Sequence, residues 1–226
     1  MVSSDIYIIK ATSYRESSNM YEAVAKDYGK VTLIHKGVKS NRKNNPLELF
    51  TNYRAHWSGK GNIKYLRDYE NLERINFSYK HNIIGMYYNE LLYYLTKNDY
   101  HIEALYSHYD ESLKSLMGTT HLFVELNNYE IGLLILAGHY LIFEHDSDNQ
   151  FIDKSKKYSY IPDVGPKISA SNNGSYMGET LLALSGNFPY NEISIKESRV
   201  LMKRLIDYYI QPKNIKTREI LKYISL

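Results

Sequence analysis

The spacing of apolar residues changes near residue 78, and this change constrains the fold more than any other feature of the chain. Before it, short runs alternate apolar and polar residues, as in DIYIIKATSY at residues 5–14, and a period of two indicates β-strands. After it, apolar residues such as Ile84, Tyr88 and Leu91 recur three or four positions apart, which indicates helices. The sequence therefore predicts an α+β protein with its strands first and its helices second.

The predicted strands are joined by turn signals that are typical of antiparallel pairing. Tyr28-Gly29 joins two of them, because glycine adopts the positive φ of a tight hairpin turn. A polar loop over residues 39–45 ends at Pro46, and SGKG at 58–61 joins the last two strands. The economical arrangement of five such strands is a small barrel, so we expect a five-stranded OB-fold β-barrel over residues 1–78.

Residues 79–226 are predicted to form an all-α helical domain. Helical spacing runs through residues 81–97 and 101–117, and residues 119–138 are apolar nearly all round, as in a buried central helix. Helical spacing resumes after residue 177. The polar stretch between, near residues 144–175, is rich in turn signals and is expected to be loop or short strands.

Charge and cysteine content narrow the function classes. Residues 1–80 carry 14 Lys+Arg against 8 Asp+Glu, whereas residues 81–226 carry 14 against 17. This asymmetry suggests that the first domain meets a polyanion. The chain has no cysteine, which excludes disulfides, a thiolate zinc site and a cysteine nucleophile, and we expect no cofactor.

The basic residues of the predicted barrel are candidates for binding nucleic acid, since OB-folds combine a charged groove with aromatic stacking platforms. The cations are Lys30, Lys36, Lys39, Arg42, Lys43, Lys60, Lys64 and Arg67, and the aromatic candidates are Tyr53, Trp57 and Tyr65. Lys64 and Tyr65 point to opposite faces of a strand, so both join one surface only if the barrel edge wraps. The alternative interpretation is an ordinary solvated surface. His35 alternates with core residues and is expected to be a buried, hydrogen-bonded imidazole.

Nothing local in the sequence indicates catalysis or a membrane. The chain lacks a G-x-S-x-G elbow, the P-loop spacing and a helical pair of metal-binding histidines. It also lacks a long apolar run and a signal-peptide pattern. We therefore expect a protein of the cytoplasm that is not an enzyme.

Segments spread over nearly the whole chain have an order and spacing found in one known family. They include SYRESSNMYEAVAKDYGKVTLIHKGVKS (13–40), LELFTNYRAHWSGKGNIKYLRDYE (47–70), YYNELL (87–92), YEIGLLILAG (129–138), GETLLALSGNF (178–188) and KNIKTREIL (213–221). Together they resemble the bacterial RecO family of DNA repair proteins.

The resemblance implies a recombination mediator with an OB-fold followed by a helical domain. Such proteins bind single- and double-stranded DNA and anneal complementary strands. They act with RecR, and in many organisms RecF, to load RecA onto strands coated by single-strand-binding protein (SSB). The resemblance also implies a location at the nucleoid and docking of the acidic, apolar SSB tail on the helical domain.

Two departures from the family pattern bear on the sites. Many relatives carry a four-cysteine zinc module, which a chain without cysteine cannot form. Relatives often have Arg just before the central-helix motif, where it can grip the tail carboxylate. Here Asn127 and Asn128 precede Tyr129, so docking of the tail at this segment is expected to be either weaker or built from another cation, such as Lys114 or Lys203.

Two other function classes fit the same pattern. An OB-fold does not reveal which nucleic acid it binds, so an RNA-binding module is one alternative. A protein-interaction module without annealing activity, whose basic loop only solvates the surface, is the other.

Overall fold

The structure is a computed structural model, and it describes residues 1–38, 45–96, 103–169, 174–211 and 214–223. The chain divides into two compact units, Met1–Glu125 with Ile215–Leu226, and Leu126–Asn214. In the described ranges, no helix is both long and apolar enough to cross a membrane. All of the predicted barrel lies in the first unit.

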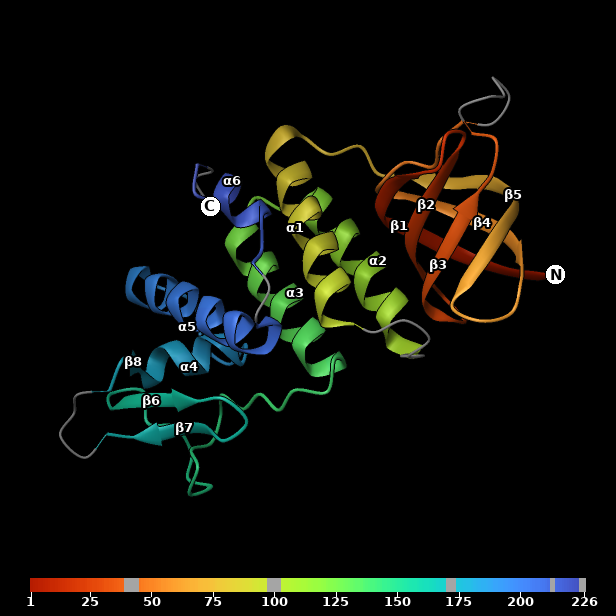
Figure 1. Cartoon of the computed structure of the whole chain (residues 1–226). Coiled ribbons are helices and arrows are strands. Elements are labelled where there is room, and N and C mark those ends of the chain that lie inside the picture. Colours follow the sequence, from red (N-terminus) through yellow and green to blue (C-terminus); the bar gives the residue numbers. More distant parts are fainter. Residues whose placement is uncertain (39–44, 97–102, 170–173, 212–213, 224–226) are drawn as a thin grey trace. The chain divides into compact units, whose positions relative to one another are not determined.

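The first unit opens with five strands that close into a barrel (Figure 1). They are β1 (Val2–Tyr14), β2 (Ser18–Ala25), β3 (Gly29–His35), β4 (Thr51–Ser58) and β5 (Ile63–Arg74). Their order around the barrel is β1-β2-β3-β5-β4, and every neighbouring pair is antiparallel except β3 with β5. This arrangement is OB-like and confirms the predicted five-stranded barrel.

Alternate residues of β1, β2, β3 and β4, together with Leu66 of β5, fill the barrel interior. The predicted hairpin forms, with Gly29 at a φ of 64°, and its register places Ala23 opposite Val31 in the core. On β4 the inward positions are Tyr53, Ala55 and Trp57. The buried cluster consists of Ile6, Ile8, Tyr21, Ala23, Ala25, Val31, Leu33, Leu47, Tyr53, Ala55, Trp57 and Leu66.

Helices of the same unit cover one side of the barrel. α1 (Tyr79–Leu95) contacts β1, and α2 (Glu103–Gly118) contacts β2 and β3. Tyr7 of β1 donates a hydrogen bond to Asp110 Oδ1 at 2.7 Å, and its ring packs against Tyr106 and Tyr109. All seven residues of β3 are consequently buried, whereas most of β5 is exposed.

The short helix α6 (Thr217–Leu221) also belongs to the first unit and packs on α1. Its first turn is held by Glu90, whose carboxylate accepts the backbone N–H groups of Lys216 at 2.9 Å and Thr217 at 2.8 Å. A carboxylate at a helix N-terminus satisfies backbone donors that have no partner inside the helix.

The second unit combines helices with a small sheet. α3 (Leu122–Leu136) runs across the division between the units, and α4 (Gly178–Leu184) and α5 (Glu192–Ile210) follow. α5 begins with a capping box, in which Asn191 Oδ1 accepts from the Ser194 N–H at 2.8 Å and Ser194 Oγ accepts from the Asn191 N–H at 2.7 Å.

The polar stretch near residues 144–175 contains strands as well as loops. β6 (Lys157–Ile161) pairs with β7 (Gly165–Ile168) and β8 (Tyr176–Met177), and this adds a small sheet to the predicted helical domain. Tyr158 and Tyr160 alternate as buried residues of β6, a period of two that the surrounding polar residues obscured. The domain boundary expected at residue 78 stays a prediction. In the structure α1 and α2, which follow that residue, belong to the same compact unit as the barrel.

Candidate nucleic-acid interface

The predicted DNA-binding residues that reach solvent gather where β3 and β5 run side by side. Lys36 follows the end of β3, Lys60 lies in the turn between β4 and β5, and Lys64 and Arg67 lie on β5. The parallel pairing of Leu33 with Lys64 and of Ile34 with Tyr65 sets this arrangement. We call this surface the open edge; it consists of Lys36, Lys60, Lys64, Tyr65 and Arg67.

Three of the four cations of the open edge contact neutral groups. Lys36 Nζ lies 4.6 Å from the ring centroid of Tyr65, and Arg67 Nε donates to Ser58 Oγ at 2.7 Å. Lys64 donates to the carbonyl oxygen of Gly61. In the part of the chain that the structure describes, none of the four forms an ion pair with a carboxylate. Their positive charge is therefore left for a partner.

Tyr65 is the aromatic residue that the open edge offers for stacking. It is 37% exposed, and Lys64 beside it is half-buried, so both reach solvent although they point to opposite faces of β5. That the barrel edge wraps so that both join one surface stays a prediction. Aromatic rings beside cations suit the bases and phosphates of a single strand.

Trp57 and Tyr53 are wrong as stacking platforms. Trp57 is only 1% exposed and lies in the barrel core with Tyr53, and Tyr28 packs edge-on against its indole ring at 5.5 Å. Their alternation with Ala55 along β4 was the sequence signal for a shared inward face. Stacking on either ring would require the core to open.

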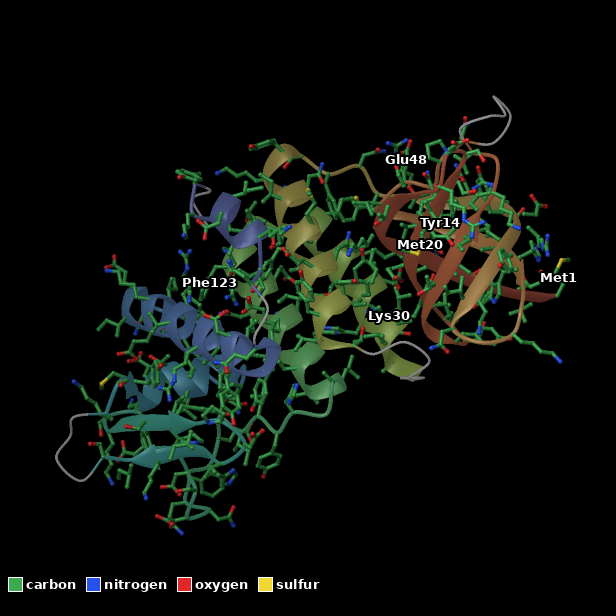
Figure 2. The ribbon with its side chains drawn as sticks, viewed as in Figure 1. Met1, Tyr14, Met20, Lys30, Glu48 and Phe123 are labelled. Carbon is green, nitrogen blue, oxygen red and sulfur yellow. The ribbon has the colours of Figure 1, made fainter. Side chains whose placement is uncertain are left out.

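Lys30 is likewise wrong as a DNA contact. It is 4% exposed, and Nζ donates to the carbonyl oxygens of Tyr93 at 2.8 Å and Thr96 at 3.1 Å, at the C-terminal end of α1. Figure 2 shows Lys30 on the side of the barrel that faces the helices of the same unit. Carbonyl groups at a helix C-terminus lack partners within the helix and attract a cation, so Lys30 stabilises the packing of α1 on the barrel.

Lys39, Arg42 and Lys43 lie outside the described residues. Their part in DNA binding stays a prediction. The described ends of this segment are Val38, which is buried, and Asn45, whose carbonyl oxygen accepts a hydrogen bond from Tyr69 at 2.7 Å.

The predicted partner-binding residues are not equally available. Asn127 is buried, and its Nδ2 donates to the Tyr190 hydroxyl at 3.3 Å, while Tyr129 is buried beside it in α3. Asn128 is exposed. Lys114, in the first unit, is within 3.0 Å of Asp110 and 3.5 Å of Glu73. Two nearby carboxylates already compensate its charge, and they raise the pKa of Lys114.

Lys203 lies in a groove on α5 that the sequence did not reveal. The groove has a volume of about 560 Å³, and two of its apolar residues are unusually accessible, Val200 at 62% and Tyr208 at 49%. Lys203 pairs with Asp207 at 2.6 Å, and Arg204 Nη2 donates to the carbonyl oxygen of Tyr160 at 3.1 Å. The groove is lined by Pro162, Val200, Lys203, Arg204, Asp207, Tyr208 and Gln211.

Across the described ranges, no cluster of three or more His, Asp or Glu side chains is placed to hold a metal ion. That the chain needs no zinc or other cofactor stays a prediction.

Comparison with known proteins covers both domains. Residues 1–74 match the model for the N-terminal region of recombination protein O, and residues 76–218 match the model for its C-terminal region. Proteins named DNA repair protein RecO from Nitrosococcus oceani and Coxiella burnetii are each 30% identical to this chain. The alignments cover 96% of this chain and 91% of the first relative, and 95% of this chain and 95% of the second.

Proposed function

This chain belongs to the RecO family of DNA repair proteins, and on that premise we propose that it is a recombination mediator. In this role it binds single- and double-stranded DNA, anneals complementary strands and helps to load RecA onto SSB-coated single strands. The observation that carries the proposal is the open edge, where three of the four cations contact neutral groups beside an exposed tyrosine ring.

Annealing needs no catalytic group. Two strands repel each other through their phosphates, and a surface that neutralises phosphates lowers this repulsion while releasing condensed counterions. The open edge supplies the charge, and Tyr65 supplies a ring on which an unpaired base can stack. We therefore propose that the protein acts without turnover chemistry.

We propose that the SSB tail docks in the α5 groove. An acidic, apolar peptide needs an apolar floor and nearby cations, and the groove combines Val200 and Tyr208 with Lys203 and Arg204. Of the two cations suggested for this role, Lys114 is held between two carboxylates and Lys203 by one, which favours Lys203. RecR, and RecF where an organism has it, are the further proposed partners, in the cytoplasm at the nucleoid.

Annealing of labelled complementary DNA tests the main proposal. We expect Lys36, Lys64 and Arg67, replaced together by Gln, to abolish most of the rate enhancement while leaving the unfolding transition in place. A matched control removes three exposed lysines of the second unit, Lys154, Lys167 and Lys196, and should anneal normally. Equal loss in both triple variants would contradict a role for the open edge. Tighter binding of RNA than of DNA would favour an RNA-binding module instead.

A fluorescent peptide with the sequence of the SSB tail tests the docking site. Val200→Asp places a negative charge on the groove floor. It should weaken peptide binding about tenfold or more, as expected for a residue that the bound peptide would bury at the centre of the interface. Ile193→Asp is the control, because Ile193 is exposed on the same helix but does not line the groove. Unchanged affinity in Val200→Asp would remove the groove from the proposal.

A further inference from the structure

The barrel seam between β3 and β5 opens into a small cavity. The two strands pair only from Thr32↔Ile63 to Ile34↔Tyr65. Beyond Tyr65, β5 pairs with β4 alone among the described strands. A cavity of about 250 Å³ lies where the pairing stops, between His35 and Lys36 at the end of β3 and residues 65–69 of β5. We call it the seam pocket.

A β-bulge explains how β5 furnishes both the wall and the rim of the seam pocket. Trp57 pairs with Leu66 and His56 with Asp68, so Arg67 is an extra residue in β5. Leu66 and Tyr69 can therefore both pack against the barrel core, while Arg67 and Asp68 stay exposed. Bulges of this kind redirect side chains and are common beside functional sites.

His35 leaves a polar atom without a partner in the wall of this pocket. It is 7% exposed, and within the described ranges its Nδ1 makes no hydrogen bond. The expected buried imidazole is therefore present, but without a hydrogen bond at that nitrogen. Burial lowers the pKa of His35, so the ring is neutral near pH 7 and each nitrogen can act as a donor or an acceptor according to the tautomer. Because this nitrogen is itself buried, the imidazole ring must turn before a ligand in the pocket can complete the hydrogen bond and remove the cost of an unsatisfied buried group.

The other side chains favour a base over a phosphate. Asp68 is exposed, and one of its carboxylate oxygens accepts the Tyr69 N–H at 2.9 Å, which leaves the second oxygen for a ligand donor. A carboxylate repels a phosphate but accepts the exocyclic amine of cytosine. The rings of Tyr65 and Tyr69 provide flat surfaces, and the Tyr69 hydroxyl is already bonded to Asn45.

The size and the rim of the pocket agree with this assignment. Its volume is just below the range of about 300–1,000 Å³ that holds drug-sized ligands, which suits a single planar base. Lys36 and Arg67 are among the lining residues and both are exposed, so they can meet the phosphates on either side of that base. A base within a duplex is paired and stacked and must leave the helix to enter the pocket, so the pocket is filled from a single strand.

Building on the proposed DNA-binding function, we propose that the seam pocket receives one unpaired base of single-stranded DNA and favours a base with an exocyclic amine over thymine. Thymine offers carbonyl oxygens where cytosine offers an amine, and a carbonyl oxygen facing Asp68 is repelled. The pocket thus gives a mild base preference to an interface whose main attraction is for phosphates.

Oligonucleotides of cytosine alone and thymine alone test this inference at about 16 nucleotides, the upper site size of one OB-fold. The wild-type chain should bind the cytosine strand about threefold to tenfold more tightly, the range that the net contribution of one ordinary hydrogen bond gives. Asp68→Asn keeps an oxygen for the Tyr69 N–H and should bring the two affinities together. Glu70→Gln removes a charge from an exposed residue outside the pocket and should keep the preference.

Each outcome decides a different point. Equal affinity of the wild-type chain for both strands overturns the seam pocket while the DNA-binding function stands. A cytosine preference that persists in Asp68→Asn also overturns the assignment. If neither strand binds the wild-type chain, the proposed function fails and the seam pocket with it.

Discussion

Two sides of one barrel use the same residue types for different purposes. On the side covered by α1 and α2, Lys30 is buried and donates to two backbone carbonyl groups. Six residues later on the open edge, Lys36 is exposed and lies over the ring of Tyr65. Trp57 and Tyr65 differ in the same way, the first in the core and the second at the surface.

The difference lies in what surrounds each side chain. A buried ammonium group stabilises a fold only when hydrogen bonds replace the water that it loses, and the end of α1 provides them. An exposed ammonium group beside neutral partners contributes little to stability and keeps its attraction for phosphates. Substitutions on the covered side should therefore change stability, and those on the open edge should change DNA binding.

Replacing Trp57 should give the largest effect on stability. Trp57→Ala leaves a cavity in the barrel core and should lower the free energy of unfolding by about 3–5 kcal/mol. Tyr65→Ala should cost less than about 0.5 kcal/mol of stability but about 1–3 kcal/mol of single-strand binding. Urea unfolding followed by circular dichroism, with DNA titrations of the folded variants, checks both. A stable Trp57→Ala protein that no longer binds DNA would reverse the two assignments.

Replacing Lys30 should give the next largest effect. Lys30→Met keeps the length of the side chain but leaves the carbonyl groups of Tyr93 and Thr96 without this donor, so the free energy of unfolding should fall by about 2–3 kcal/mol. Lys36→Met is the matched control on the open edge and should unfold like the wild-type chain. A shift of the urea midpoint in Lys36→Met equal to that in Lys30→Met would erase the distinction between the two sides.

Replacing His35 should give a smaller change, and one with a pH dependence. His35→Phe removes the nitrogen that lacks a partner and should raise the free energy of unfolding near pH 7 by about 1 kcal/mol. Because burial lowers the pKa of His35 below its ordinary 6.5, the unfolded chain takes up the proton more readily than the folded one. The contribution of neutral His35 to the free energy of unfolding is therefore fully present above pH 6.5, and it is lost as the pH falls below that value.

Measuring the free energy of unfolding against pH for the wild-type chain and for His35→Phe isolates the contribution of His35. His139, whose pKa is also lowered by burial, titrates in both proteins and cancels. Between about pH 7 and pH 5 the wild-type chain should lose more stability than His35→Phe. Parallel pH curves for the two proteins would show that His35 does not titrate differently on folding.

Local patterns in the sequence were enough for the barrel and its core face. Alternation along β4 and the hairpin glycine at Gly29 depend on near neighbours in the chain, and the structure has both. Alternation says which residues share a face, but not what covers the outer face. Lys30 is buried by a helix that ends more than sixty positions later, so its role was outside the reach of local pattern.

The seam pocket was beyond sequence reasoning for a different reason. It depends on a parallel pairing that stops at Tyr65 and on the extra residue Arg67 in β5, and neither has a signature in residue type. The groove on α5 has no sequence signature either, although its Lys203 is a cation of the kind that a tail carboxylate needs. Its apolar floor includes Val200 and Tyr208, which a helical pattern alone does not place at the surface.

The salt dependence of single-strand binding tests the central claim most directly, namely that the cations of the open edge contact phosphates. Each such contact contributes about 0.7 to the slope of log affinity against log salt concentration. Lys36→Gln, Lys64→Gln and Arg67→Gln should each flatten the wild-type slope by about that amount, whereas Lys196→Gln on α5 should leave it unchanged. A wild-type slope near zero, or one that none of the three substitutions changes, would contradict the account.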